Sequence, residues 1–243
     1  EETNSALKKI AASGRKILFV ATKKQAKDIV AEKANAVNMP YITERWPGGM
    51  LTNFITIRKA VKKMAAIDRM KKDGTFETLS KKERLQVDRQ RAKLEKNLGS
   101  ITDMTRLPGA IFIVDTTREH IAVKEAQKLK IPIFAMVDTN SDPRDVDFVI
   151  PSNDDASKSI DKILGLVTSA VAEGLSERKS EKEATEANDA NKMEAAAKVD
   201  QAKAKVETVE EKKQETPKAN QQNEKASSKQ ASSDKEVKKE KDV

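Results

Sequence analysis

Residues 108–138 read PGAIFIVDTTREHIAVKEAQKLKIPIFAMVD. Two runs rich in Ile, Val and Phe, Ala110–Asp115 and Pro132–Asp138, flank a segment whose apolar residues recur every three or four positions. Apolar runs without polar alternation are typical of strands covered on both faces, and the recurrence between them predicts an amphipathic helix over 119–130. The stretch therefore predicts a strand–helix–strand unit with parallel strands.

The same pattern occurs on both sides of this unit. Further strands are predicted at Lys16–Ala21, Tyr41–Glu44 and Phe148–Ile150. Further helices are predicted at Lys24–Asn38 and after Asp154 or Asp155, one of which is expected to cap the final helix. Because strands alternate with helices, the fold class predicted is α/β with a doubly wound parallel sheet.

Three segments match a capping box, in which a Ser or Thr at the helix start and a Glu or Gln three residues later satisfy free amide groups. They are Thr22–Gln25, Ser80–Glu83 and Thr116–Glu119. Each of them predicts the start of a helix.

Residues 54–98 interrupt the alternation of strands and helices. Apolar residues at helical spacing run along two arms on either side of a break at Asp73-Gly74; they are Phe54, Ile57, Val61, Met64 and Ile67, then Leu85, Val87, Leu94 and Leu98. A narrow apolar seam on each arm predicts an antiparallel helical hairpin of the coiled-coil type that packs mainly on itself.

This insertion carries the charge of the chain. Between Arg58 and Lys96 there are 14 Lys and Arg against 6 Asp and Glu, a surplus equal to the net charge of +8 of all 243 residues. Lys and Arg neutralise phosphates and release condensed counterions, so a basic helical hairpin on a neutral body predicts nucleic-acid binding. The alternative is that these side chains only solvate a long surface helix.

The composition divides the chain into three parts. An α/β body is expected at 1–53 and 99–175, the inserted basic helical hairpin at 54–98, and a charged C-terminal tail at 176–243. From Glu177 onward there is no aromatic residue and no Gly, and 16 basic residues balance 16 acidic ones. Such a segment buries too little apolar surface to offset its chain entropy, so the tail is predicted to be disordered. The chain opens inside an expected helix, at Glu1, and we expect a preceding segment.

Several kinds of function are disfavoured. The chain has no Cys, which excludes disulfides and thiolate zinc sites and fits a reducing cytosol. No apolar run approaches about 18–20 residues, so no membrane span is expected. Aromatic residues make up only 3% of the chain, which argues against a platform that stacks single-stranded bases. No phosphate loop or Gly-rich dinucleotide turn occurs, and no cofactor is expected.

Two strand ends leave an enzyme as an open alternative. In an open parallel sheet, ligands bind beyond the carboxyl ends of the strands, where Asp115 and Asp138 are expected. Clustered carboxylates at this edge could hold magnesium for phosphoryl transfer. The competing interpretation is that Asp at a strand end begins a turn or caps a helix.

The loop Arg45–Asn53 joins the body to the hairpin and contains the only Trp and a Gly pair. One interpretation is a structural elbow with Trp46 buried at the base of the hairpin. The other is that Arg45, Thr52 and Asn53 contact an RNA backbone there. We call this loop the elbow.

Several ordered motifs resemble the family of protein S-two of the bacterial small ribosomal subunit. The resemblance covers about Ala6–Leu175, but the segment with a His-Phe-Gly-His-like motif that usually opens this family does not occur in the chain. The most specific motif is Pro108–Glu125; the others are Gly14–Gln25, Arg45–Phe54, Leu94–Gly99, Lys130–Pro132, Asp138–Pro143 and Val149–Asp155.

The resemblance implies a flavodoxin-like body with an inserted coiled-coil hairpin and no catalysis. It also implies a structural role on the ribosome in the cytoplasm, with 16S rRNA and other small-subunit proteins as partners, among them the mRNA-binding protein S-one. No small-molecule substrate is expected. From charge and position alone, the residues predicted to bind RNA are Arg45, Asn53, Arg58, Lys59, Lys62, Lys63, Arg69, Lys71, Lys72, Arg84, Arg89 and Arg91. A further alternative makes the hairpin an adaptor that docks a protein.

Overall fold

A computed structural model describes residues 1–183 and 185. Its centre is a five-stranded sheet with the order β2-β1-β3-β4-β5, in which every neighbouring pair is parallel. The strands are β1 (Ile17–Val20), β2 (Tyr41–Ile42), β3 (Ala110–Val114), β4 (Ile133–Val137) and β5 (Phe148–Pro151). This order is the flavodoxin-like one, so the predicted doubly wound α/β fold is confirmed.

A row of phenylalanines fixes the register of four strands. Phe19 pairs with Phe112, Phe112 with Phe134, and Phe134 with Phe148. The rings of Phe19 and Phe112 lie 5.5 Å apart, and those of Phe134 and Phe148 stack at 4.4 Å. Because side chains alternate between the faces of a strand, the whole row lies on one face of the sheet.

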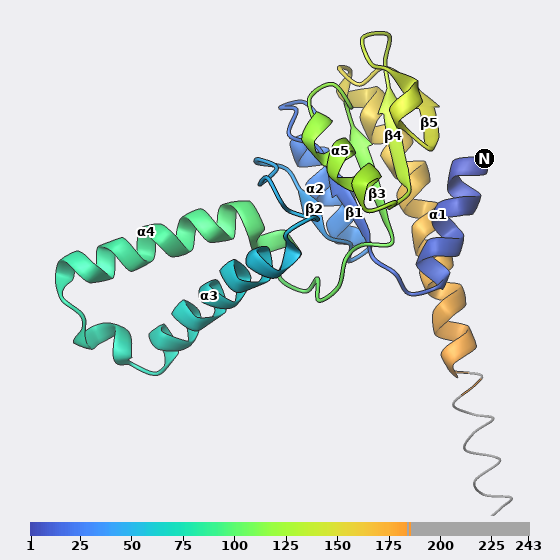
Figure 1. Ribbon diagram of the computed structural model, residues 1–243. Helices are drawn as coiled ribbons and strands as arrows, with labels where there is room; N and C mark the ends of the chain where they lie inside the picture. Colours follow the sequence, from blue (N-terminus) through green and yellow to red (C-terminus); the bar gives the residue numbers. More distant parts are fainter. Residues whose placement is uncertain (184, 186–243) are drawn as a thin grey trace, which may run out of the picture. The chain divides into compact units, whose positions relative to one another are not determined.

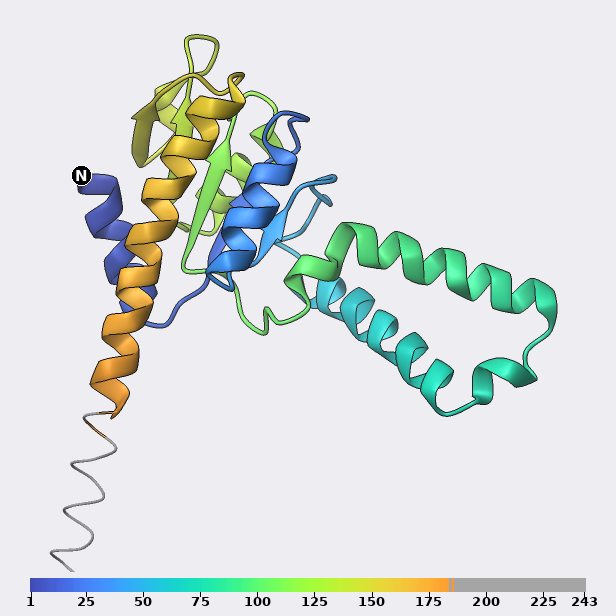
Figure 2. The same ribbon diagram turned by 180° about the vertical axis from the view of Figure 1, so that it is seen from behind.

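Helices cover both faces, which is why the strand sequences show no polar alternation. On the face of the phenylalanine row lie α1 (Glu2–Ala12), α2 (Lys27–Ala36) and the helix 157–183 (Figure 2). The other face packs against α5 (His120–Lys128), the elbow and the base of the hairpin (Figure 1). A short 3-10 helix, η3 (Pro143–Asp145), precedes β5.

Two of the three predicted capping boxes are wrong. The helices start later than expected, at Lys27 and His120, and neither start has a side-chain cap. Instead, the amide and hydroxyl of Thr22 both donate to the carboxylate of Glu119, so the two motifs pair with each other across the sheet edge. This is a tertiary contact between neighbouring strands β1 and β3, which local spacing alone does not reveal.

The start of the last helix was also predicted wrongly. The side chain of Asn153 accepts hydrogen bonds from the amides of Asp155 and Ala156, at 2.8 and 2.9 Å. The carboxylate of Asp154 points elsewhere, toward Lys23. Neither aspartate therefore caps this helix in the structure.

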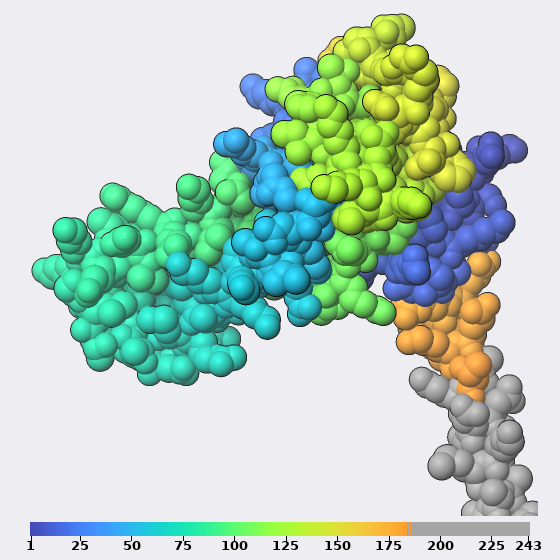
Figure 3. All heavy atoms as spheres, viewed as in Figure 1, coloured from blue at the N-terminus to red at the C-terminus, as the bar shows by residue number. Residues whose placement is uncertain are grey.

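The hairpin consists of α3 (Phe54–Lys72), η1 (Thr75–Thr78), α4 (Lys81–Leu98) and η2 (Gly99–Ile101) (Figures 1 and 3). Its turn contains Gly74 in the left-handed region, at φ +74°, and α4 starts with the predicted capping box of Ser80 and Glu83. Met64 and Ile67 are buried between the arms, whereas Leu85, which was predicted to lie in the seam, is exposed. Phe54, Ile57 and Leu94 pack against the core of the body, so the base of the hairpin does not pack only on itself.

The tail begins later than predicted. Residues 176–183, which were expected to be disordered, continue the helix 157–183, and Glu177 binds Lys8 of α1 at 2.8 Å. Apart from residue 185, the rest of the predicted tail lies outside the described residues. Within residues 1–183, none of the helices combines the length and apolar character that crossing a bilayer requires.

Candidate nucleic-acid interface

Most of the predicted RNA-binding side chains of the hairpin are on the molecular surface. Arg84 and Arg91 are half-buried, and the others are exposed. Arg58, Lys62 and Arg69 follow one another at spacings of four and seven residues, so they lie along one face of α3. None of these three is in an ion pair with another described residue. We call them the α3 row.

Other cations of the hairpin hold its arms together. The guanidinium of Arg91 on α4 contacts the carboxylate of Asp68 on α3, and Lys71 lies 2.6 Å from Asp88 across the same gap. The hydrogen bond from Arg91 keeps the pKa of Asp68 below its ordinary value. Arg84 donates to the carbonyl of Leu79 at 2.9 Å. Their charges are therefore partly used within the hairpin, which leaves the α3 row as the stronger candidate for phosphate contact.

The elbow is organised around one buried carboxylate, Glu125 of α5. Its Oε1 accepts from the indole of Trp46 at 3.2 Å and from the amide of Gly49 at 2.7 Å. Its Oε2 accepts from the amides of Leu51 and Thr52, at 2.9 and 3.1 Å, and from the Thr52 hydroxyl at 3.2 Å. Both oxygens are thus saturated by the elbow.

Hydrogen bonding decides the charge state of this group. Burial alone would raise the pKa of the Glu125 carboxyl, but the amides of Thr52 and Leu51, the Trp46 indole and the Gly49 amide bring it below its ordinary value. Glu125 is therefore an anion near neutral pH, and charge-assisted hydrogen bonds fix the loop from which α3 starts.

The elbow residues predicted to bind RNA have different surroundings. Trp46 is only 6% exposed and packs into the core, as the structural interpretation of this loop expects. Thr52 is held by Glu125, while Arg45 is exposed and is in no ion pair within the described residues. Asn53 immediately precedes α3 and accepts from the hydroxyl of Thr56 at 2.8 Å. Arg45 and Asn53 therefore remain accessible beside the base of the hairpin.

The carboxyl edge of the sheet carries the aspartates of the alternative enzyme prediction. One carboxylate oxygen each from Asp138, Asp154 and Asp155 lies within 4.8 Å of the others. A buried lysine, Lys23, enters this group: its ammonium lies 2.7 Å from Asp154, 2.6 Å from Asp155 and 3.4 Å from Asp115. Positive charge at this edge is thus supplied by the protein itself.

The surroundings of Lys23 keep it charged. Burial alone would lower the pKa of its ammonium, but the hydrogen bonds to Asp154 and Asp155 raise it above the ordinary value. A buried ion pair of this kind joins β1 to the loops after β3 and β5, which gives the aspartates a structural role.

Sequence reasoning missed both of these buried charged residues. Glu125 carried a usable signal, because it lies between Ala122 and Ala126 on the face of the helix that the apolar residues define. A carboxylate on a buried face requires several donors, and the elbow provides them. Lys23 carried no comparable signal, since its partners lie more than 90 residues away in the chain.

Comparisons with known proteins give one consistent result. The family profile described as Ribosomal protein S2 matches residues 1–174. The small ribosomal subunit protein uS2 of Flavobacterium johnsoniae is 80% identical over 197 residues, covering 81% of this chain and 78% of that protein. The protein of the same name from Flavobacterium psychrophilum is 82% identical over 184 residues, covering 76% and 69%. That of Phocaeicola vulgatus is 64% identical over 204 residues, covering 84% and 73%. With most of its length matched at these identities, the chain belongs to the ribosomal protein S2 family.

Proposed function

We propose that this chain is a structural constituent of the small ribosomal subunit that binds 16S rRNA through its basic hairpin. Its place of action is the ribosome in the cytoplasm, as the family implies. Its protein partners are other small-subunit proteins, and we extend the proposal to protein S-one, which the chain would help to recruit.

The α3 row is the observation that carries the RNA part of this proposal. Three exposed cations lie on one face of a helix and have no carboxylate partners among the described residues. Such cations can contact the phosphates of an RNA backbone without reading its sequence. The exposed Arg45 of the elbow extends this surface to the base of the hairpin. Backbone contacts of this kind suit A-form RNA, which proteins recognise mainly by shape.

An enzymatic function finds no comparable support. Catalysis at the carboxyl edge would require carboxylates that are available to substrate or metal, whereas Asp154 is buried against Lys23. The relatives are named as ribosomal proteins. We therefore propose a protein without catalytic activity.

The test is a salt series with a neutralised α3 row, Arg58→Gln/Lys62→Gln/Arg69→Gln. A matched control neutralises three exposed lysines elsewhere on the body, Lys24→Gln/Lys158→Gln/Lys162→Gln. Binding to transcribed 16S rRNA is measured by filter retention at several salt concentrations.

If the α3 row binds phosphates, each lost contact makes the fall of log affinity with log salt concentration less steep by about 0.7–0.9. The slope of the variant should therefore be less steep than that of the unmodified chain by about 2 to 3. The control keeps the slope of the unmodified chain. An α3 variant that behaves like the control would refute the proposed interface. Small subunits that lack this chain should contain less protein S-one. An unchanged amount of protein S-one would refute the proposal that the chain helps to recruit it.

A further inference from the structure

A second cationic surface lies outside the hairpin, at the amino ends of β1 and β3. Because parallel strands start at the same edge, the loops before β1 and before β3 are neighbours, and the amide of Gly109 donates to the carbonyl of Lys16 at 2.8 Å. Arg15 and Lys16 come from the first loop and Arg106 from the second. Both loops lie below the sheet in Figure 1.

These cations are not neutralised by the protein. Arg15 and Arg106 are exposed, and none of the three is in an ion pair with a described residue. Two exposed carboxylates, those of Glu95 and Asp103, lie in the lining of the hollows beside these three cations. The positive charge at this edge therefore exceeds the negative charge, in contrast to the carboxyl edge around Lys23.

Two arginine side chains lie close to glycines here. A Cβ on Gly109 would lie 2.5 Å from the Cβ of Arg15, so the stem of this arginine packs directly on the Gly109 backbone. A Cβ on Gly14, whose φ is +77°, would collide with the guanidinium of Arg178.

Two hollows open on either side of Lys16, each with a volume of about 430 Å³. The first lies at the base of the hairpin, where the end of α4 and η2 form one wall, and the second lies between the two loops. Both volumes fall in the range of small-ligand sites, about 300–1,000 Å³. The hollows continue the proposed RNA surface from the hairpin onto the body.

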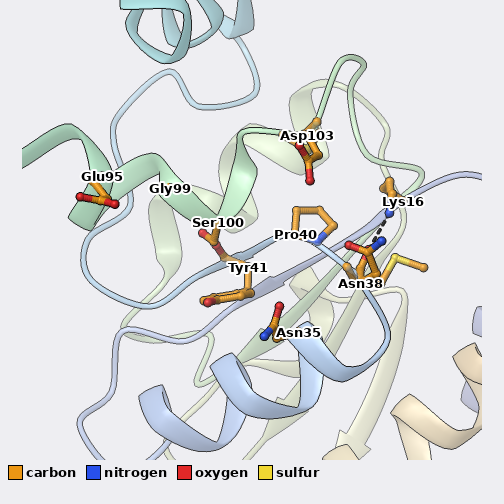
Figure 4. Close-up of a pocket in the computed structure, with 11 residues that line it drawn as sticks. Lys16, Asn35, Asn38, Pro40, Tyr41, Glu95, Gly99, Ser100 and Asp103 are labelled. Carbon is orange, nitrogen blue, oxygen red and sulfur yellow. Dashed lines mark hydrogen bonds between the residues drawn. The ribbon is translucent and has the colours of Figure 1, made fainter. Parts of the chain in front are cut away.

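The first hollow has groups that suit the base of a nucleotide, together with two carboxylates, those of Glu95 and Asp103, that disfavour a phosphate. Tyr41 lies in it as a flat apolar surface, with the amide side chain of Asn35 beside it (Figure 4). The ammonium of Lys16 points at the carbonyl of Asn38, 2.5 Å away, so the hollow has one cation at its rim and two carboxylates in its lining. Amide groups can read base edges, an aromatic ring can carry a base, and a lysine can bind a phosphate.

We propose that the amino edge of the sheet at β1 and β3 is a second RNA-binding site. Arg15, Lys16 and Arg106 bind phosphates, and the hollow beside Tyr41 takes the base of one nucleotide that is unstacked from its helix, while its phosphate stays outside the hollow. The inference rests on the proposed function, because it assigns a further contact to the same RNA.

The test uses the absence of cysteine from the chain, which allows single cysteines to carry an iron-EDTA group that cleaves nearby RNA. Three exposed positions are compared in full-length chains incorporated into small subunits. Thr105→Cys reports on the proposed site, Ala66→Cys on the hairpin, and Asn140→Cys on the acidic carboxyl edge.

The inference expects strong cleavage of 16S rRNA from Thr105→Cys and little from Asn140→Cys. Cleavage from Ala66→Cys without cleavage from Thr105→Cys would overturn the inference and leave the hairpin proposal intact. Failure of both probes would overturn the proposed function as well. Crosslinking of the Thr105 position to a protein, with no RNA cleavage, would assign this edge to a protein neighbour and refute the inference.

A second measurement excludes a purely structural effect. The exposed pair is neutralised in Arg15→Gln/Arg106→Gln, and the control is Lys158→Gln/Lys162→Gln, with equal thermal stability required of both. The salt slope for 16S rRNA should become less steep by about 1.4 to 1.8 in the first variant only. Equal slopes in the two variants would contradict phosphate binding at this edge.

Discussion

Replacing Glu125 by Gln tests how much the elbow depends on one carboxylate. The substitution keeps the size of the side chain but turns one acceptor oxygen into an NH2 group. In one orientation the NH2 group faces the amides of Leu51 and Thr52, and in the other it faces the Trp46 indole and the Gly49 amide. Either way, two N–H donors of the elbow lose their acceptor.

The expected cost follows from those two donors. A buried donor without an acceptor costs about 1–3 kcal/mol, and local relaxation of the loop recovers part of it. We therefore expect the free energy of unfolding to fall by about 3 kcal/mol. At roughly 2–4 °C per kcal/mol for a domain of this size, the Tm falls by about 6–12 °C.

Urea unfolding provides the measurement, because Trp46 is the only Trp of the chain and reports directly on the elbow. The matched control is Glu32→Gln, an exposed glutamate of α2 that is in no ion pair with a described residue. A loss below about 1 kcal/mol, or one equal to that of the control, would refute the assigned role of Glu125.

The pH dependence gives an independent check on the same residue. The pKa of Glu125 lies below its ordinary value of 4.5 in the folded protein, so its charged form is the one that folding stabilises. That stabilisation is complete when the pH is above the ordinary pKa of a glutamate, and it is lost as the pH falls through the pKa of Glu125 in the folded protein. The stability difference between the unmodified chain and Glu125→Gln should stay constant from neutral pH to about 5 and shrink at lower pH. A difference that grows in acid would contradict this sign.

Three further substitutions test other contacts by urea unfolding and amide exchange. Lys23→Met leaves the buried Asp154 carboxylate without its ammonium and should cost about 3–5 kcal/mol at neutral pH, and a loss below about 1 kcal/mol would argue against the ion pair. Ser80→Ala removes the capping box of α4 and should cost about 1 kcal/mol, and no loss would mean that the cap contributes nothing. Gly174→Ala places a methyl group against the carbonyl of Lys8 and should cost about 1–3 kcal/mol with faster amide exchange in α1, whereas unchanged exchange there would contradict the close approach.

The strands and the hairpin could be predicted from the sequence because their signals are local. Apolar runs such as Ala110–Val114 require cover on both faces, and the flavodoxin-like order of the sheet agrees with the family resemblance. The hairpin followed from the spacing of its apolar residues and from the capping box at Ser80, which lies on an exposed turn with no competing partner. The buried positions Met64 and Ile67 agree with that spacing.

The predictions that failed depend on contacts between distant segments. Thr22 and Glu119 each fit a local cap, but their side chains bind each other because β1 and β3 are neighbours in the sheet. The helix continues past residue 176, and Glu177 there pairs with Lys8, a residue of α1 near the start of the sequence. Spacing along one segment contains no information about such partners.

The candidate site shows the same division. The positive charges along α3 are evident from the sequence, so the prediction included the α3 row. The pairing of Arg91 with Asp68 across the two arms is not evident from the sequence and was not predicted. The cations at the amino edge, Arg15 and Arg106, lie 91 positions apart in the chain and become neighbours only in the folded sheet. Composition could therefore predict a nucleic-acid partner, but not the full surface that meets it.

Retention on the ribosome tests the central claim most directly. Small subunits are reassembled with the unmodified chain, with the α3 variant Arg58→Gln/Lys62→Gln/Arg69→Gln or with the lysine control, washed at moderate salt and sedimented. Hairpin binding to 16S rRNA predicts that the unmodified chain and the control stay with the subunit while the α3 variant is lost to the supernatant. Equal retention of all three chains would contradict it.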